Sequence, residues 1–595
     1  MRLMERLGRA LVAVAVPEGV YVGWRLLGTD PEDIAFEVLR DGVPVCAVPA
    51  GAATNWLDRG GHAGCTYGLA ARAGGREGRL PDRASVWAQN WLAIPLAVPP
   101  PGASPAGRSY TYSANDASVG DLDGDGQYEI VLKWEPSNAH DNAHAGYTGP
   151  VFLDAYRLDG HFLWRIDLGP NIRAGAHYTQ FMVYDLDGDG RAEVACKTAD
   201  GTRDGTGAVI GEASADHRNG DGFILRGPEF LTVFEGRTGR ALATAPYVPP
   251  RGDVTAWGDA RGNRVDRFLA GVACLDGHLP SLVMCRGYYT RSVLAAWDWR
   301  GGALRLRWVF DSDAPGNGAY AGQGNHSLAV ADVDGDGCDE IIYGACAIDH
   351  DGTGLYSTGL GHGDALHVGD LDPDRPGLEV FQVHEHPSAH GIEMHDARTG
   401  EILWGVPTTG DTGRGMAADI DPGRRGTECW AHGALYSCRG EVIPGPAPSS
   451  CNFGVWWDGD LSRELLDRNR IDKWDPPRGR TVNLLTAAGC ASNNGTKATP
   501  ALTADLFGDW REEVIWRTED SGELRIYTTT DLTAHRLPTL MHDPVYRLAV
   551  AWQNTAYNQP PHPGFHLGEG MAPPPRPAIA VPDGERREAD AEPAP

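Results

Sequence analysis

The chain of 595 residues lacks the sequence features that mark several large classes of protein. It contains no run of eighteen apolar residues, so we expect that it does not span a membrane. No Gly-x-Ser-x-Gly nucleophile motif stands at the end of an expected strand, and no phosphate-binding loop ending in Lys-Ser or Lys-Thr is present. The eleven cysteines are scattered without a Cys-x-x-Cys pair, so the sequence indicates neither a disulfide framework nor a zinc site.

Positive charge is also scarce. The chain has 52 lysines and arginines against 80 aspartates and glutamates, which gives a net charge of −28. This balance argues against a nucleic-acid partner. It does not exclude an anionic substrate, because much of the negative charge lies in aspartate clusters where bound divalent cations would cancel it.

Long helical periodicities are rare, whereas 78 glycines and 42 prolines supply the turns that many short strands need. One segment, 460–468, has apolar residues at helical spacing (Leu461, Leu465 and Leu466) and predicts a helix. The rest of the chain predicts an all-β protein.

What the sequence does contain is a repeated aspartate-rich loop between two apolar strands. Three copies are nearly perfect and close with a glutamate at the ninth position: Asp121, Asp123 and Asp125 with Glu129; Asp185, Asp187 and Asp189 with Glu193; Asp332, Asp334 and Asp336 with Glu340. Three copies are degenerate: Asp370, Asp372 and Asp374 with Glu379; Asp419 and Asp421 with Glu428; Asp505 and Asp509 with Glu512.

Alternate carboxylates on a tight, glycine-containing loop converge on one point, where a hard cation such as Ca²⁺ relieves their repulsion. An EF-hand does not fit, because its closing glutamate stands at position twelve of the loop. We expect these loops to be structural calcium clips, since six equivalent loops cannot all meet one substrate.

The strands around the loops predict the architecture. A second hairpin with an aromatic strand follows several loops, as at 153–164 and 392–404, and two hairpins form a four-stranded sheet. Repeated sheets of this kind are the blades of a propeller. Seven or eight such blades fit the length of the segment, and we predict an eight-bladed β-propeller over residues 104–571. A small fibronectin-like β-sandwich domain precedes it at 1–103, and a tail rich in Pro, Glu, Asp and Arg, expected to be disordered, follows at 572–595.

Five motifs resemble a known family. They are DLDGDGQYEIVLKW at 121–134, RAGAHYTQFMVYDLDGDG at 173–190, ACKTADGT at 195–202, FGVWWDGDL at 453–461 and NGTK at 494–497. The chain closely resembles the rhamnogalacturonan lyases of polysaccharide lyase family 11. The resemblance implies an eight-bladed propeller with several Ca²⁺ ions. It also implies β-elimination at the bond between rhamnose and galacturonate in rhamnogalacturonan I, an anionic plant cell-wall polysaccharide.

The same resemblance implies a set of site residues. Lys497 is expected to be the base, Arg414 a carboxylate clamp or second candidate for the base, and Tyr557 a residue that positions the substrate or returns a proton. The implied substrate-binding positions are Asn115, Glu135, Asn494, Gly495 and Thr496, and Glu135 stands where the family has aspartate. The implied ligands of a site calcium are His326, His362, Asp364, Glu385 and Asn554.

The chemistry explains why these residue types are needed. The galacturonate carboxylate opposes the negative charge that develops when its neighbouring proton leaves, and a bound cation neutralises it. Nearby positive charge also lowers the pKa of a lysine toward the neutral form that can accept a proton.

Other interpretations remain at this point. A calcium-dependent, integrin-like adhesion or carbohydrate-recognition propeller would show no catalysis. A quinone-dependent or glycoside-processing propeller would need a cofactor pocket or a pair of opposed acids. We expect a monomer. Arg2, Arg6 and Arg9 before the apolar segment 10–16 suggest a leader, but no cleavage site follows, so we expect a cytoplasmic protein, with secretion as the alternative.

Overall fold

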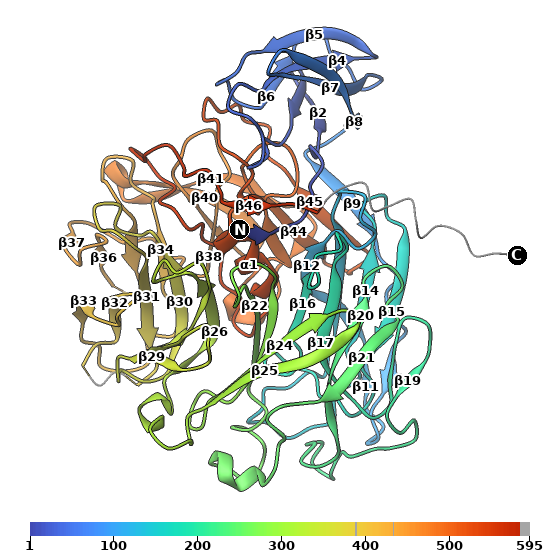
Figure 1. Cartoon of the computed structure of the whole chain (residues 1–595), viewed down its shortest axis with the longest axis vertical. Helices are drawn as coiled ribbons and strands as arrows, with labels where there is room; N and C mark the ends of the chain where they lie inside the picture. The colour runs from blue at the N-terminus through green and yellow to red at the C-terminus, as the bar shows by residue number, and fades with distance from the viewer. Residues whose placement is uncertain (387–388, 432, 583–595) are drawn as a thin grey trace, which may run out of the picture.

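The computed structural model describes residues 1–386, 389–431 and 433–582, and the regular structure among these residues is almost entirely β-strand (Figure 1). Residues 583–595 of the expected tail lie outside the described part. In the described ranges, no helix has the length and hydropathy needed to cross a membrane.

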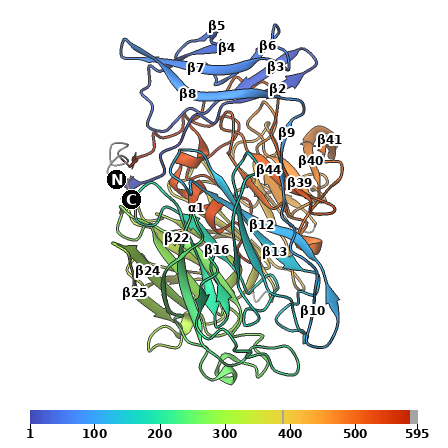
Figure 2. The ribbon, with the colours of Figure 1, turned by 90° about the vertical axis from the view of Figure 1, so that its right-hand side faces the viewer.

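The N-terminal domain is a small sandwich-like β-structure at one end of the molecule (Figure 2). Its strands follow the order β5-β4-β7-β8-β2-β3-β6. Their bounds are β2 Val12–Val16, β3 Gly19–Gly23, β4 Ala35–Arg40, β5 Val43–Val48, β6 Asn55–Asp58, β7 Thr66–Ala73 and β8 Arg76–Trp87. The long strand β8 pairs with β7 along most of its length and with β2 at its end, so one strand joins two halves that enclose Trp24, Phe36 and Tyr67.

Eight antiparallel sheets of four main strands follow among the described residues. The first four comprise β12 Tyr112–Gly120, β13 Glu129–Pro136, β14 Phe152–Tyr156 and β15 Phe162–Asp167; β16 Phe181–Tyr184, β17 Glu193–Ala199, β20 Glu229–Glu235 and β21 Ala241–Pro246; β22 Phe268–Ala273, β23 Ser281–Arg286, β24 Val293–Arg300 and β25 Ala303–Asp311; β26 Gly324–Ala331, β27 Glu340–Gly344, β28 Cys346–Ile348 and β29 Gly354–Ser357. The last four comprise β30 Gly363–Gly369, β31 Glu379–His384, β32 Ile392–Asp396 and β33 Ile402–Val406; β34 Met416–Ala418, β35 Glu428–Trp430, β36 Leu435–Tyr436 and β37 Val442–Ile443; β38 Phe453–Val455, β39 Glu464–Asp467, β40 Arg470–Asp475 and β41 Arg480–Thr486; β43 Leu502–Ala504, β44 Glu513–Thr518, β45 Glu523–Tyr527 and β9 Trp91–Pro95.

The remaining elements are short. They are the strands β1 Arg2–Leu3, β10 Gly102–Ala103, β11 Ser109–Tyr110, β18 Thr202–Arg203, β19 Val209–Ile210, β42 Cys490–Ala491 and β46 Ile579–Ala580, and the 3₁₀ turns η1 Val254–Trp257, η2 Gly318–Tyr320, η3 Pro476–Arg478, η4 Gly495–Lys497 and η5 Leu540–His542. A single bridge between Asn325 and Gly363 joins the fourth sheet to the fifth.

A nine-residue helix, α1 (Pro544–Trp552), lies among the first strands of the sheets (Figure 1). Asp543 caps its N-terminus, because the Asp543 side chain accepts a hydrogen bond from the N–H of Tyr546. Pro544 is the first helical residue, and its ring fixes φ near the helical value. The helix contacts β12, β16, β22, β26 and β43. Its Arg547 forms a buried, bidentate ion pair with Glu5 at 2.6 Å for both bonds, so the N-terminal segment is held against the helix.

Two segments outside the expected propeller range 104–571 also form paired strands. Strand β9 pairs antiparallel with β45 and completes the eighth sheet. It lies before residue 103, so the expected domain boundary would separate this strand from its sheet. Strand β46 pairs in parallel with β1, and Ile579 is buried. Residues 579–580 therefore depart from the expectation of a disordered tail, because backbone pairing and the burial of an apolar side chain hold this strand.

The helix predicted at 460–468 is also wrong. The structure forms β39 there, and Leu465 and Leu466 are adjacent, buried residues of that strand. Both faces of the seventh sheet are covered, because Leu465 and Leu466 pack in different hydrophobic clusters. Apolar residues therefore need not alternate along β39, and the helical spacing of Leu461, Leu465 and Leu466 is a coincidence.

Candidate active site

The predicted active-site residues lie at one end of the sheets, and the aspartate loops lie at the other. Asn115, His326 and Asp364 stand near the starts of β12, β26 and β30, while the loops beginning at Asp121, Asp332 and Asp370 follow the ends of the same strands. The aspartate loops and the site residues are therefore separated by the length of a strand, which supports a structural role for the loops.

Lys497 ends the turn η4, whose flanking residues Asn494 and Ala498 both have positive φ. Its ammonium nitrogen lies 4.0 Å from the ring centroid of Tyr557 and 3.8 Å from Asp364 Oδ2. Burial, and then the charge of Arg414, lower the pKa of Lys497 below its ordinary value. Because a lowered pKa increases the neutral fraction, this amine is suited to accept a proton.

A network of amides fixes the turn that carries Lys497. Asn494 accepts a hydrogen bond from Asn115 at 3.2 Å, and its amide nitrogen donates to Asp116 at 3.0 Å and to Asn558 at 3.1 Å. Lys133 donates to the other oxygen of Asp116 at 2.5 Å. The structure thus brings the predicted residues Asn115 and Asn494 together, and the positive φ of Asn494 is compensated by side-chain bonds.

The other predicted substrate-binding residues border this network. Gly495 and Thr496 are exposed in the turn itself. Glu135 lies on β13, and burial raises its pKa, while the nearby Lys133 opposes the increase.

Arg414 is almost fully buried beside Lys497. It donates to the carbonyls of Tyr557 at 2.9 Å and Asn452 at 2.7 Å, whereas its Nε has no partner. Burial lowers its pKa. The guanidinium therefore anchors the Tyr557 backbone and places positive charge next to the lysine.

Four of the five predicted calcium ligands converge. His326, His362, Asp364 and Glu385 each offer an atom within 4.8 Å of the others. His362 Nδ1 donates to the Gly324 carbonyl at 2.5 Å, while His362 Nε2 and Glu385 Oε2 are buried without a hydrogen-bond partner. Burial lowers the pKa of His362 to about 3, so the imidazole is neutral and can act as a ligand. These orphaned atoms fit a divalent cation.

The fifth predicted ligand, Asn554, forms hydrogen bonds to the backbone of Phe181. Its side-chain oxygen accepts the N–H of Phe181 at 3.1 Å, and its nitrogen donates to the Phe181 carbonyl at 2.8 Å. The amide therefore bonds to the edge of β16, its oxygen keeps a second lone pair, and its role as a calcium ligand stays a prediction.

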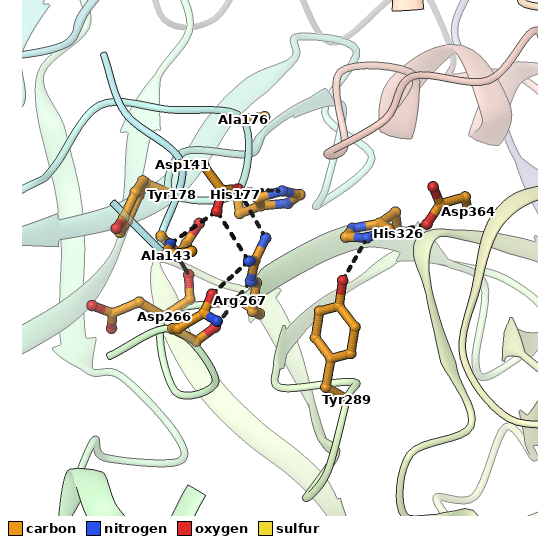
Figure 3. A network of polar contacts seen from close by, with 12 residues as sticks. Asp141, Ala143, Ala176, His177, Tyr178, Asp266, Arg267, Tyr289, His326 and Asp364 are labelled. Carbon is orange, nitrogen blue, oxygen red and sulfur yellow. Dashed lines mark hydrogen bonds and ion pairs between the residues drawn. The ribbon is translucent and has the colours of Figure 1, made fainter. Parts of the chain in front are cut away.

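Sequence reasoning missed the polar contacts that surround the cluster. Figure 3 shows Tyr289 against His326, and a second group in which Asp141 lies between His177 and Arg267. Tyr288 bridges the Nδ1 atoms of His177 at 3.1 Å and His326 at 2.9 Å, and Tyr289 contacts His326 Nε2 at 3.1 Å. Beyond His177, Asp141 pairs with Arg267 at 3.2 Å. The adjacent residues Tyr288 and Tyr289 are visible in the sequence as a pair of candidate polar residues. The contact between Asp141 and Arg267 is not, because these residues are far apart in the sequence.

The aspartate loops share one brace at the opposite end of the sheets. The glutamate that opens the second strand accepts the N–H of the second loop residue, as Glu129 does from Leu122 at 2.8 Å and Glu193 from Leu186 at 2.9 Å. The degenerate copy at 505 uses Glu513 and not the predicted Glu512. In the copies at 121–129 and 185–193, three acids lie within reach of one ion, and in the copy at 332–340 Glu340 Oε1 is buried without a partner. These loops fit calcium.

In other copies a basic side chain faces the acids. Arg439 bonds Asp372 at 3.0 and 3.2 Å, so this predicted ligand already has a cationic partner. A further copy at 456–464, which the sequence analysis did not recognise, has Lys473 at its centre. The ammonium lies 2.5 Å from Asp458, 2.7 Å from Asp460 and 3.1 Å from Glu464.

Comparison with known proteins decides the family. Residues 91–577 match the model of the rhamnogalacturonan lyase family 11 C-terminal domain, and residues 2–87 match the β-sheet domain of rhamnogalacturonan I lyases. The chain belongs to rhamnogalacturonan lyase family 11. This lyase is 63% identical over 582 residues to the rhamnogalacturonan endolyase YesW of Bacillus subtilis, covering 98% of this chain and 94% of that protein.

Further relatives agree. The lyase is 63% identical over 599 residues to the rhamnogalacturonan exolyase YesX of Bacillus subtilis, covering 98% of both proteins. The structure of a Bacillus licheniformis rhamnogalacturonan lyase superimposes with a TM-score of 0.96 at 64% identity, covering 97% of this chain and 99% of that one. The family resemblance noted from the motifs is confirmed, and the chain is a polysaccharide lyase and not an adhesion module. Identity does not separate endo from exo action, because the two relatives match equally.

Proposed function

We propose that this lyase cleaves rhamnogalacturonan I by calcium-assisted β-elimination with Lys497 as the base. The proton leaves C5 of galacturonate, its electron pair forms the C4–C5 double bond, and the C4–O bond to rhamnose breaks. The released oxygen then takes up a proton. No protein nucleophile and no hydrolytic water take part.

The position of Lys497 carries this proposal. Its amine lies beside the four-ligand cluster, and burial together with Arg414 lowers its pKa. A calcium ion on His326, His362, Asp364 and Glu385 would neutralise the galacturonate carboxylate and stabilise the charge that develops beside it.

Tyr557 and Arg414 complete the arrangement. The Tyr557 ring stacks on His326 with the ring centroids 3.9 Å apart, and the Lys497 ammonium lies over the same ring. Burial raises the pKa of Tyr557, so its hydroxyl stays protonated and can return a proton to the leaving oxygen. Arg414 keeps positive charge near the substrate carboxylate, and Asn115, Glu135 and the turn 494–496 contact the sugars.

We also propose that the eight four-stranded sheets are blades of a propeller and that the intact aspartate loops bind calcium. Contacts between the first strands of neighbouring sheets, the central position of α1 and the closure of the eighth sheet by β9 support the propeller. The converging carboxylates support the ions.

Replacing Lys497 with methionine tests the reaction. A positioned general base contributes about 10²–10⁴ in rate, so formation of the unsaturated product from rhamnogalacturonan I, followed by ultraviolet absorbance, should fall at least about 100-fold. The melting temperature should stay within a few degrees of the wild type, and homogalacturonan should not be cleaved by either protein. Full activity in K497M would exclude Lys497 as the base.

A further inference from the structure

An arginine in the loop before β22 lies close to the cluster of calcium ligands and pairs with no acid of the described residues. Arg264 follows the turn η1, and its loop is held by Asp259, whose carboxylate accepts the N–H of Asn263 at 3.1 Å and that of Arg264 at 2.7 Å. The Arg264 side chain is half-buried. Its guanidinium forms no hydrogen bond and no ion pair with any residue that the structure describes, so its N–H donors remain available to an external anion.

A shortage of acids does not explain this. Acidic residues outnumber basic ones by 80 to 52, and three arginines of the same region are paired. Arg251, Arg267 and Arg286 each approach a carboxylate, at 2.8, 3.2 and 2.6 Å. Arg264 therefore differs from its neighbours in keeping a charged, planar fork of donors that no protein carboxylate occupies.

The Tyr289 ring places this guanidinium next to the cluster. The Arg264 guanidinium carbon lies 4.3 Å from the centroid of the Tyr289 ring, and the His362 ring centroid lies 4.0 Å from it. Two groups this close cannot share one face of a ring, so Tyr289 lies between Arg264 and His362. The Tyr289 hydroxyl contacts His326 Nε2 at 3.1 Å (Figure 3). A single aromatic ring thus separates the guanidinium from the proposed calcium ligands.

We propose that Arg264 binds the carboxylate of a second galacturonate, two sugars along the polymer from the galacturonate that loses its proton. This inference rests on the proposed cleavage of rhamnogalacturonan I, whose backbone alternates rhamnose with galacturonate and so carries a carboxylate on every second sugar. A guanidinium holds a carboxylate through two parallel N–H···O bonds, and stacking on Tyr289 fixes the plane of that fork.

This role concerns affinity and not chemistry. A carboxylate two sugars from the reacting carbon keeps its charge throughout the reaction, so Arg264 binds the ground state and the transition state equally. Loss of such a contact raises KM and leaves kcat unchanged. A contact with the reacting galacturonate itself would instead change kcat, because charge develops beside that carboxylate.

Steady-state kinetics of R264M on rhamnogalacturonan I test the inference, with the unsaturated product followed by ultraviolet absorbance. A hydrogen bond to a charged group is strong enough that KM should rise about 10-fold or more. The value of kcat should stay within about twofold of the wild type. R264K keeps the charge but not the planar fork, so its KM should lie between those of R264M and the wild type.

R305M is the matched control, because it removes an exposed arginine from β25, the outer strand of the third sheet. Its KM should equal that of the wild type, and melting temperatures check that each variant is folded. An unchanged KM in R264M, an equal rise in R305M, a KM in R264K as high as in R264M, or a fall in kcat of R264M would overturn the assignment. These outcomes are separate from the role of Lys497, because loss of the base lowers kcat in a protein that retains Arg264.

Discussion

Replacing Lys473 with methionine should create a calcium site. The ammonium lies within 3.1 Å of three carboxylates in the loop 456–464, at the place where the intact loops would hold an ion. Burial alone would lower the pKa of Lys473, but Glu464, Asp458 and Asp460 raise it, so the side chain is charged. Methionine keeps much of the length and removes the charge, which leaves the three acids facing one another.

The magnitude follows from the burial. Removing one partner of a buried ion pair costs about 3–5 kcal/mol, and a lysine that is 25% exposed belongs at the lower end. We therefore expect K473M to be about 3 kcal/mol less stable than the wild type in chelator. Calcium at 100 times its dissociation constant would restore about 2.7 kcal/mol, so the two proteins should become nearly equal.

The assay combines metal content with unfolding. Calcium stoichiometry by mass spectrometry of dialysed protein should be one ion higher in K473M than in the wild type, and urea unfolding should show the calcium-dependent recovery. R470M, which removes an exposed charge from the same strand, serves as the control. The reasoning would be refuted if K473M bound no additional ion and its stability deficit were the same with chelator and with calcium.

Two further predictions concern stability. In chelator, stability should fall as pH rises from about 4 to about 8, because burial raises the folded-state pKa of Asp121 to about 7 and of Glu129 to about 8, so the folded chain binds protons that the unfolded chain releases. Calcium should abolish this slope in urea unfolding, and an unchanged slope would contradict calcium binding at these loops. Replacing Glu5 with glutamine should cost about 3 kcal/mol or more, since Arg547 would be left as a buried charge, and a stability equal to the wild type would show that the pair does not hold the N-terminal segment.

The sequence could predict most of the sheets, because strands and turns are local features. The loops at 121–129, 185–193 and 332–340 appear where the aspartates indicated, each between the expected strands. The helix was misplaced because Leu465 and Leu466 are both buried in a sheet covered on two faces, while the actual signal, Asp543 followed by Pro544 at the start of α1, was overlooked. Predicting a strand from alternating apolar and polar residues assumes that one face of the sheet is exposed to solvent. That assumption fails where both faces of a sheet are covered by neighbouring sheets.

The site was only partly readable. Family resemblance located Lys497, Arg414 and the His326 cluster, but no local pattern indicates that Arg267 meets Asp141, or that Lys473 faces the acids of its loop. Such contacts depend on the packing of distant segments, and so does the hydrogen bond between Asn554 and β16.

Chemical rescue tests the central claim most directly. K497A, loaded with calcium, is assayed on rhamnogalacturonan I with increasing concentrations of small primary amines, and the unsaturated product is measured by ultraviolet absorbance. If Lys497 is the base, the variant is inactive alone, and its rate rises with the concentration of neutral amine and with the basicity of that amine. A variant that is active without amine, or that no amine restores although it is folded and binds calcium, would contradict the account.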